Sequence, residues 1–377
     1  MQDIAREAEL EKLARLLQTE RETLDFLEDT PPDALRTIRL GLTDALFEKF
    51  RPVFAGFARM STLLPLAIGA RISQHVLGPV LGGRIAGEMP PERAMEMAER
   101  LSDEFLADTC VQMEPTRAQP MIRSFPVARS VAITRLLLAR GEYITMGQFV
   151  DVLPEKTLLA ATDVIESPLA LLRIAFFVED SDQLARVVAH LSTPRRSGVI
   201  RAAAEHDLWP AVLDTLDRID PATRSELAAQ ALNEDESILD SLIRSAAAHD
   251  LWPHLLALGA TLDDSIQARF AGQPAFDEAE IICSVADSVV AHQSWTLFER
   301  QVRLMGVERA AAMLAVCASQ RPAAIAGMAG HFELADDTCA VLVAGSQQLT
   351  ADQRQAALEA AGPDTALSQL LGQPTKA

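Results

Sequence analysis

The sequence predicts an all-α protein: a right-handed α-solenoid of helix-pair repeats with a period of about 43 residues, preceded by an N-terminal helical cap region. The first observation behind this prediction is composition. Hydrophobic residues make up 49 % of the 377 residues but aromatic residues only 5 %, which favours closely packed helices over sheets rich in aromatic and β-branched side chains. The second is an internal repeat, and repeats of about 20 to 50 residues are typical of stacked helical units.

The repeat is carried by a short motif that ends one helix and begins the next. Residues 206–210 (HDLWP) return 43 residues later as residues 249–253 (HDLWP), and a further step of 43 reaches a third histidine and tryptophan. All three tryptophans of the chain therefore occupy one repeat position. The repeated positions are His206, Trp209, His249, Trp252, His292 and Trp295.

This motif has a simple structural interpretation. We expect His206 to close a helix in the left-handed conformation, and Asp207 to cap the helix that follows. Pro210 then falls in the first helical turn, where its missing N–H costs little, and Trp209 fills the seam between neighbouring repeats. Because one unit cannot bury its own apolar face, the units must stack. On this basis residues 160–340 resemble helical repeats of the HEAT type.

A second repeat, with a shorter period, lies upstream: Met89–Ala94 (MPPERA) recurs 24 residues later as Met113–Ala118 (MEPTRA). Each copy predicts a proline-containing turn followed by a short helix. Residues 86–165 thereby resemble the cytoplasmic N-terminal helical superhelix of MgtE-type magnesium transporters, which implies short stacked helices here. No Mg²⁺ ligand carries over, because the transporters' acidic sites have no counterpart in this sequence.

These observations divide the chain into five regions. The first half begins with an amphipathic helical region that contains one predicted helix over residues 3–28. This helix either packs on the array as an end cap, or serves in self-association into a homo-oligomer or in binding a partner. The regions are residues 1–48 (N-terminal helical), 49–87 (apolar and basic), 88–165 (short-helix repeats similar to MgtE), 166–362 (HEAT-like repeats) and 363–377 (flexible tail).

Residues 49–87, which we call the basic–apolar segment, contain no Asp or Glu in a chain with a formal net charge of −19. The segment is rich in large apolar residues. A basic and apolar helical stretch suits an anionic membrane surface. The alternatives are a buried helical hairpin whose arginines pair with acidic residues elsewhere, or contact with another ligand. The candidate contact residues are Lys49, Arg51, Arg59, Arg71 and Arg84.

No pattern in the sequence predicts catalysis, a cofactor or a metal. The repeated histidines would lie about 10 Å apart in stacked helices, too far for one ion with metal–nitrogen bonds of about 2 Å. Cys110 and Cys317 fall in apolar helical patterns, so we expect them in the core. No glycine pattern of the phosphate-binding kind occurs, and the acidic pairs fall where turns or helix starts are expected.

The charge balance limits the partners. A net charge of −19 argues against nucleic acid, which needs a basic surface. A charged N-terminus, dispersed cysteines and the lack of a long uncharged apolar run indicate a cytoplasmic protein, either free or peripheral at the inner membrane. The scarcity of lysine indicates a bacterial source. We therefore expect a non-enzymatic scaffold that binds protein partners with basic segments, or alternatively a peripheral membrane protein that docks through residues 49–87.

Overall fold

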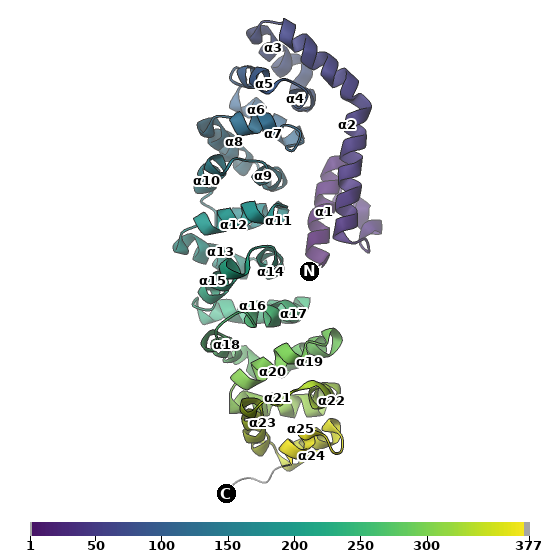
Figure 1. Ribbon diagram of the computed structural model, residues 1–377, viewed down its shortest axis with the longest axis vertical. Coiled ribbons are helices and arrows are strands. Elements are labelled where there is room, and N and C mark those ends of the chain that lie inside the picture. The colour runs from purple at the N-terminus through teal and green to yellow at the C-terminus, as the bar shows by residue number, and fades with distance from the viewer. Residues whose placement is uncertain (1, 373–377) are drawn as a thin grey trace. The chain divides into compact units, whose positions relative to one another are not determined.

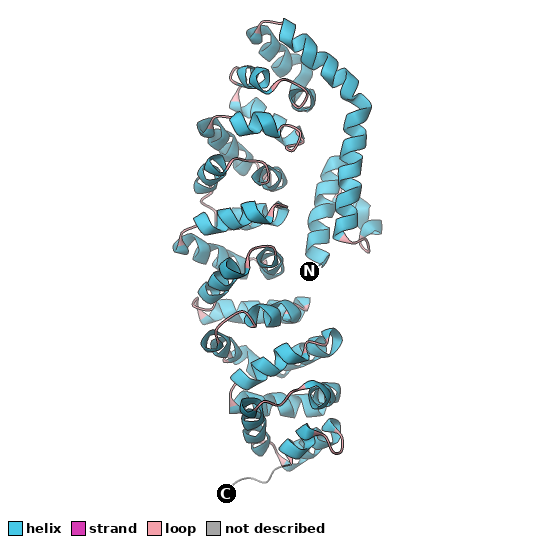
Figure 2. Ribbon diagram, viewed as in Figure 1, coloured by secondary structure: helices cyan, strands magenta, loops and turns pink. Residues whose placement is uncertain are grey.

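The computed structural model describes residues 2–372, with side chains from residue 5 onward. Regular secondary structure within this part is entirely helical, as predicted, and contains no strand (Figure 2). The chain forms two compact units, Met1–Val199 and Ile200–Ala377, and the division falls inside helix α13 (Thr193–Glu205). Residues 373–377 of the predicted tail lie outside the described residues.

Proline explains why most of the helices are short. It is favoured in the first turn of a helix but disrupts a helix interior, and it stands in the first turn of α5, α11 and α17, among others. Serine or aspartate side chains cap further starts, as Ser102 does by accepting from the Phe105 amide. The starts of the successive short helices are therefore determined by residues within or next to each helix.

The first unit begins with a hairpin of two longer helices. In chain order its elements are α1 (Gln2–Leu17), η1 (Arg21–Leu27), α2 (Pro32–Leu63), α3 (Leu66–Ile72), the π-helical turn η2 (Ser73–Leu77), α4 (Gly78–Ala86), α5 (Pro91–Ala98), α6 (Asp103–Gln112), α7 (Gln119–Ser124), α8 (Val127–Ala139), α9 (Tyr143–Val150), α10 (Glu155–Asp163), α11 (Pro168–Phe177) and α12 (Ser181–His190).

After this hairpin, the helices of the first unit alternate between two layers (Figure 1). In one layer α4, α6, α8, α10 and α12 pack one on the next; in the other, α5 packs on both α3 and α7, and α11 packs on α9. Close approach of α9 and α11 depends on Gly147, where a Cβ would lie 2.6 Å from that of Phe177.

The predicted single helix over residues 3–28 is wrong. Helix α1 ends at Leu17, and Gln18 takes a positive φ of 54°, which reverses the chain into η1. The apolar side chains Leu10 and Leu13 of α1 are 0 % and 1 % exposed because they pack within the chain against Leu24 and Leu35.

The second unit also consists of short helices. Each helix packs mainly on the second or third helix that follows it in the chain, as α21 packs on α23 and α24. Its elements after α13 are α14 (Trp209–Asp217), α15 (Pro221–Ala231), α16 (Glu236–His249), α17 (Trp252–Gly259), α18 (Asp264–Ala271), η3 (Pro274–Asp277), α19 (Ala279–His292), α20 (Trp295–Leu304), α21 (Val307–Gln320), α22 (Pro322–His331), α23 (Asp336–Gln347), α24 (Ala351–Ala361) and α25 (Ala366–Leu371).

Two of the three tryptophans have equivalent surroundings. Trp209 and Trp252 each begin a helix and are each 2 % exposed. The indole Nε1 of Trp209 donates to Ser241 Oγ at 3.0 Å, and that of Trp252 donates to Ser284 Oγ at 2.9 Å. Ser241 and Ser284 in turn donate to the carbonyls of Ala204 and Ala247, both at 3.4 Å. The whole contact recurs at an offset of 43 residues.

The third tryptophan differs for a reason visible in the sequence. Gly327 stands where Ser241 and Ser284 stand in the earlier copies, so Trp295 has no serine acceptor. Its indole instead donates to Gln293 Oε1 at 3.1 Å and stacks on His331 with ring centroids 5.4 Å apart. A Cβ at position 327 would lie 2.0 Å from the Trp295 ring. Glycine therefore makes room for the ring.

The expected role of His206 is also wrong. The left-handed residue is the next one in each copy, namely Asp207, Asp250 and Gln293, with φ of 50°, 49° and 55°. Aspartate tolerates this conformation better than most residues, and it does not cap the following helix, which begins after Leu208. The repeated histidines pair between copies: His249 Nε2 lies 3.5 Å from Asp207 Oδ2, and His292 Nε2 lies 2.8 Å from Asp250 Oδ2.

Candidate functional site

Exposed large apolar side chains are confined to the start of the chain. Among the described residues, every one of them lies between Leu17 and Leu81, and most belong to the basic–apolar segment. Scattered exposed apolar residues are normal on a protein surface, but a concentration of them indicates an interaction site. Those within the segment are Phe50, Val53, Phe57, Met60, Leu63, Ile68, Val76, Val80 and Leu81.

On α2 these side chains form one stripe. Phe50, Val53, Phe57 and Met60 recur every three or four residues, the spacing that places side chains on one face of a helix. Their exposed fractions are 44 %, 52 %, 39 % and 60 %. A second apolar face of the same helix carries Phe47, Phe54 and Ala58 into a buried cluster with Ile85 and Met97. Helix α2 thus has two apolar faces, of which one is buried in the first unit and the other is exposed.

Further exposed apolar side chains lie on the next elements of the segment. Leu63 is 84 % exposed at the end of α2, and Ile68 on α3 is 50 % exposed. Val76 in η2 and Val80 in α4 are 75 % and 42 % exposed. Helix α4 packs against both α2 and η2, so these elements form one connected part of the first unit.

Among the described residues, most cations of the segment have no acidic partner. Arg51 forms ion pairs with Glu88 at 3.1 Å and with Glu48 at 3.5 Å. Lys49 lies over the Phe50 ring at 5.5 Å and Arg84 over the Phe54 ring at 5.9 Å. Arg59 donates to the Ala55 carbonyl at 3.3 Å. Within the part of the chain that is described, no carboxylate approaches Lys49, Arg59, Arg71 or Arg84 to ion-pair distance.

A buried ion-pair cluster attaches the α1–α2 hairpin to the remainder of the first unit. Its members Glu9, Lys12 and Arg39 are 6 %, 4 % and 5 % exposed. Lys12 Nζ and Arg39 Nη2 approach Glu179 Oε1 at 2.7 Å and 2.6 Å, and Arg39 Nε approaches Glu9 Oε2 at 2.8 Å. Glu179 lies between α11 and α12, so the cluster joins segments far apart in the sequence.

The carboxyl groups around this cluster have shifted pKa values. Burial raises the pKa of Glu179, but its attraction to Lys12 and Arg39 outweighs burial and lowers the pKa below its usual value. Burial raises the pKa of neighbouring Asp151 to about 6, despite hydrogen bonds from the Asp180 and Glu179 amides. The cluster was not predicted from the sequence, although a lysine at position 12 between the apolar Leu10 and Leu13 is a local signal for a buried cation.

Two of the four cysteine thiols are held in the protonated form by their surroundings. Burial raises the pKa of Cys110 to about 12, and burial together with Cys283 does the same for Cys317, so both thiols stay protonated. No group of three or more His, Cys, Asp or Glu side chains that could hold a metal ion occurs in the described residues.

Comparison of the chain with family models, with curated proteins and with solved structures finds no match. Among the described helices, none combines the length and apolar character needed to cross a bilayer.

Proposed function

We propose that this protein is a non-enzymatic helical-repeat protein, a right-handed α-solenoid with a period of about 43 residues, that docks peripherally on anionic membrane surfaces through the basic–apolar segment. One observation carries the docking proposal. The exposed apolar side chains and the cations without acidic partners gather in the same segment, which contains no carboxylate.

The chemistry of this segment fits a bilayer surface. An interfacial helix places apolar side chains at the boundary of headgroups and acyl chains while its cations meet anionic headgroups. Each Lys or Arg near such a surface contributes about 1 kcal/mol. Lys49, Arg59 and Arg71 are exposed, so they can make these contacts without first breaking an ion pair. The acidic character of the whole chain opposes docking by other faces.

The solenoid proposal rests on contacts in the second unit. The tryptophan–serine hydrogen bonds and the histidine–aspartate pairs recur at the same offset, as expected where equivalent helix pairs stack.

Flotation with lipid vesicles tests the docking. We expect the full chain to float with vesicles that contain phosphatidylglycerol, not with vesicles of phosphatidylcholine alone, and to be released as salt screens the charges. The variant Lys49→Glu/Arg59→Glu/Arg71→Glu should lose binding. The matched control, Arg100→Glu/Arg123→Glu/Arg135→Glu, changes the net charge equally at exposed positions outside the segment and should still float. Equal binding by both variants would refute the proposal.

Binding of a protein partner is a second candidate, and a groove in the second unit favours it. The groove has a volume of about 640 Å³ and is lined by Asp250, Glu280 and Asp287 together with polar side chains and Arg321. Carboxylates in a groove would favour a partner segment rich in Lys or Arg. Cross-linking in cells of the parent organism should recover such a partner through this groove, and Asp287→Lys should abolish its capture.

A further inference from the structure

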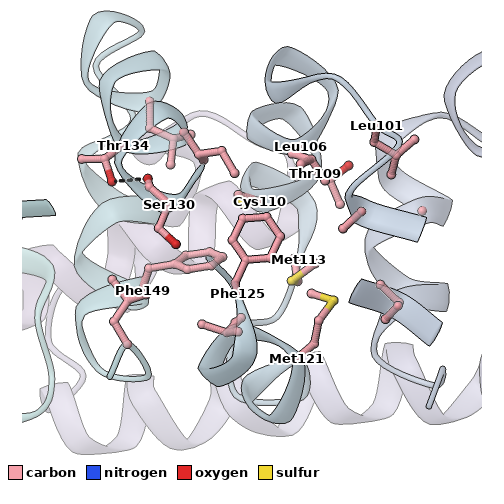
Figure 3. Close-up of a pocket in the computed structure, with 18 of the residues that line it drawn as sticks. Leu101, Leu106, Thr109, Cys110, Met113, Met121, Phe125, Ser130, Thr134 and Phe149 are labelled. Atoms are coloured by element: carbon pink, nitrogen blue, oxygen red, sulfur yellow. Dashed lines mark hydrogen bonds between the residues drawn. The ribbon is translucent and has the colours of Figure 1, made fainter. Parts of the chain in front are cut away.

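The first unit contains a cavity that the docking proposal does not use. Its volume is about 290 Å³, and it lies between the two helical layers. Every helix from α2 to α12 contributes lining residues, so the cavity is elongated along the layers. Figure 3 shows its middle part, where the side chains of Met113, Met121, Phe125 and Phe149 point into the space between the helices.

The lining is uncharged. Apart from apolar side chains and glycines, it carries serine and threonine hydroxyls and the thiol of Cys110. Hydroxyls in the lining are already used within their helices: Thr109 donates to the Phe105 carbonyl at 2.8 Å, and Thr134 donates to the Ser130 carbonyl at 2.9 Å. A water molecule needs two to four polar partners, and this lining offers few. The cavity therefore suits an apolar occupant.

Size and shape narrow the class of occupant. Apolar cavities of roughly 150 Å³ stay dry and bind small hydrocarbons, and this one is larger at about 290 Å³. An occupant that passes successive helices must be long and thin. An unbranched hydrocarbon chain has that form, whereas a compact ring system would fill only one section.

The cavity reaches the protein surface at α2. Phe57 and Met60 line it, and they are also 39 % and 60 % exposed. This end of the cavity is therefore accessible to an acyl chain from outside.

We propose that the cavity binds one long acyl chain, which enters at the end formed by Phe57 and Met60 of α2. A long acyl chain belongs both to a free fatty acid and to an anionic phospholipid. This inference goes beyond membrane docking and does not depend on it, because the cavity is lined mainly by residues outside the exposed stripe.

Methionine methyl signals in the NMR spectrum of the full chain test this proposal. On titration with palmitate, the signals of Met113 and Met121 should shift. Those of Met313 and Met328, which are buried in the second unit, should stay fixed. Shifts confined to Met60 would show binding at the surface stripe, and no shifts would show an empty cavity. Either result would overturn the proposal.

Filling the cavity gives a second test. Cys110→Phe/Ser130→Phe should abolish the palmitate-induced shifts, whereas Gln112→Phe, an exposed position on the same helix α6, should retain them. Unchanged binding by the filled variant, with native circular dichroism, would place the ligand elsewhere.

The two lipid sources and the two proposals can be separated. Co-elution with isotope-labelled palmitate identifies a fatty acid, and extraction of labelled phosphatidylglycerol from vesicles identifies a phospholipid; neither event would contradict acyl binding. Lys49→Glu/Arg71→Glu should abolish flotation but keep the palmitate shifts at Met113 and Met121. Loss of both properties together would contradict the claim that the cavity acts independently.

Discussion

Single residues decide how closely helices approach in the second unit, and Gly327 is the sharpest case. Gly327→Ala should destabilise the protein by about 1–3 kcal/mol, because an added Cβ overpacks the site; the nearest ring atom would lie 2.0 Å away. Gly330 is the matched control on the same helix, where a Cβ would meet nothing within 4 Å. Gly330→Ala should stabilise by about 0.5–1 kcal/mol. Urea unfolding measures both, and equal effects would contradict this packing.

Ser284 tests the tryptophan contact from the acceptor side. Ser284→Ala removes the acceptor of the Trp252 indole N–H, which donates at 2.9 Å from a side chain that is 2 % exposed. A buried donor left without a partner costs about 1–3 kcal/mol, so thermal unfolding should shift downward. An unchanged midpoint would mean that the hydrogen bond contributes nothing.

Asp151 should make stability depend on pH. An unfolded aspartate titrates near about 3.9, and burial raises the pKa of Asp151 to about 6 in the folded state. The folded state therefore binds the proton more tightly, and the free energy of unfolding falls as pH rises through this interval. Asp151→Asn should remove that fall and gain about 3 kcal/mol at pH 7 but only about 0.5 kcal/mol at pH 4. Stability curves that run parallel from pH 4 to pH 7 would contradict the assignment.

At the scale of elements, the hairpin of α1 and α2 depends on the buried ion-pair cluster. Arg39→Met would leave Glu9 and Glu179 short of a buried partner, so we expect a loss of about 3–5 kcal/mol and faster hydrogen exchange in α1. Arg36 contacts the same Glu179 at 2.7 Å but is 48 % exposed. Arg36→Met should therefore cost at most about 1 kcal/mol. Equal losses would show that burial of the pair does not matter.

The elements themselves follow from local signals in the sequence. Proline in the first turn marks the starts of α5, α11 and α17, and the tryptophan motif marks equivalent helix starts. Local signals do not decide which of several neighbouring residues takes an unusual backbone conformation. The histidine was expected to take the left-handed conformation, but the residue that follows it does so in each copy, namely Asp207, Asp250 and Gln293.

Contacts between distant segments left no local signal. Arg39 and Glu179 lie 140 residues apart, and nothing near either of them in the sequence indicates the pairing. The cavity also could not be predicted from the sequence, because a space between two layers depends on how whole helices pack. Charge counting did locate the basic–apolar segment, but it left open whether the segment is buried, and only the structure exposes the stripe from Phe50 to Met60.

At the scale of the whole molecule, charge is distributed unevenly along the chain. The chain carries a net charge of −19, while residues 49–87 carry no acidic residue. An anionic surface should therefore attract one segment and repel the remainder. This uneven charge, combined with the exposed apolar stripe, is the basis of the docking proposal.

Quenching of an introduced indole by bromine-labelled lipid tests the docking most directly. The three native tryptophans are at most 5 % exposed, so lipid should not quench them. Emission from the indole introduced by Met60→Trp should be quenched by anionic vesicles that carry bromine on their acyl chains. Gln355→Trp, an exposed position on α24, should show no quenching. Binding to vesicles with no quenching at position 60, or with equal quenching at both positions, would contradict docking through the basic–apolar segment.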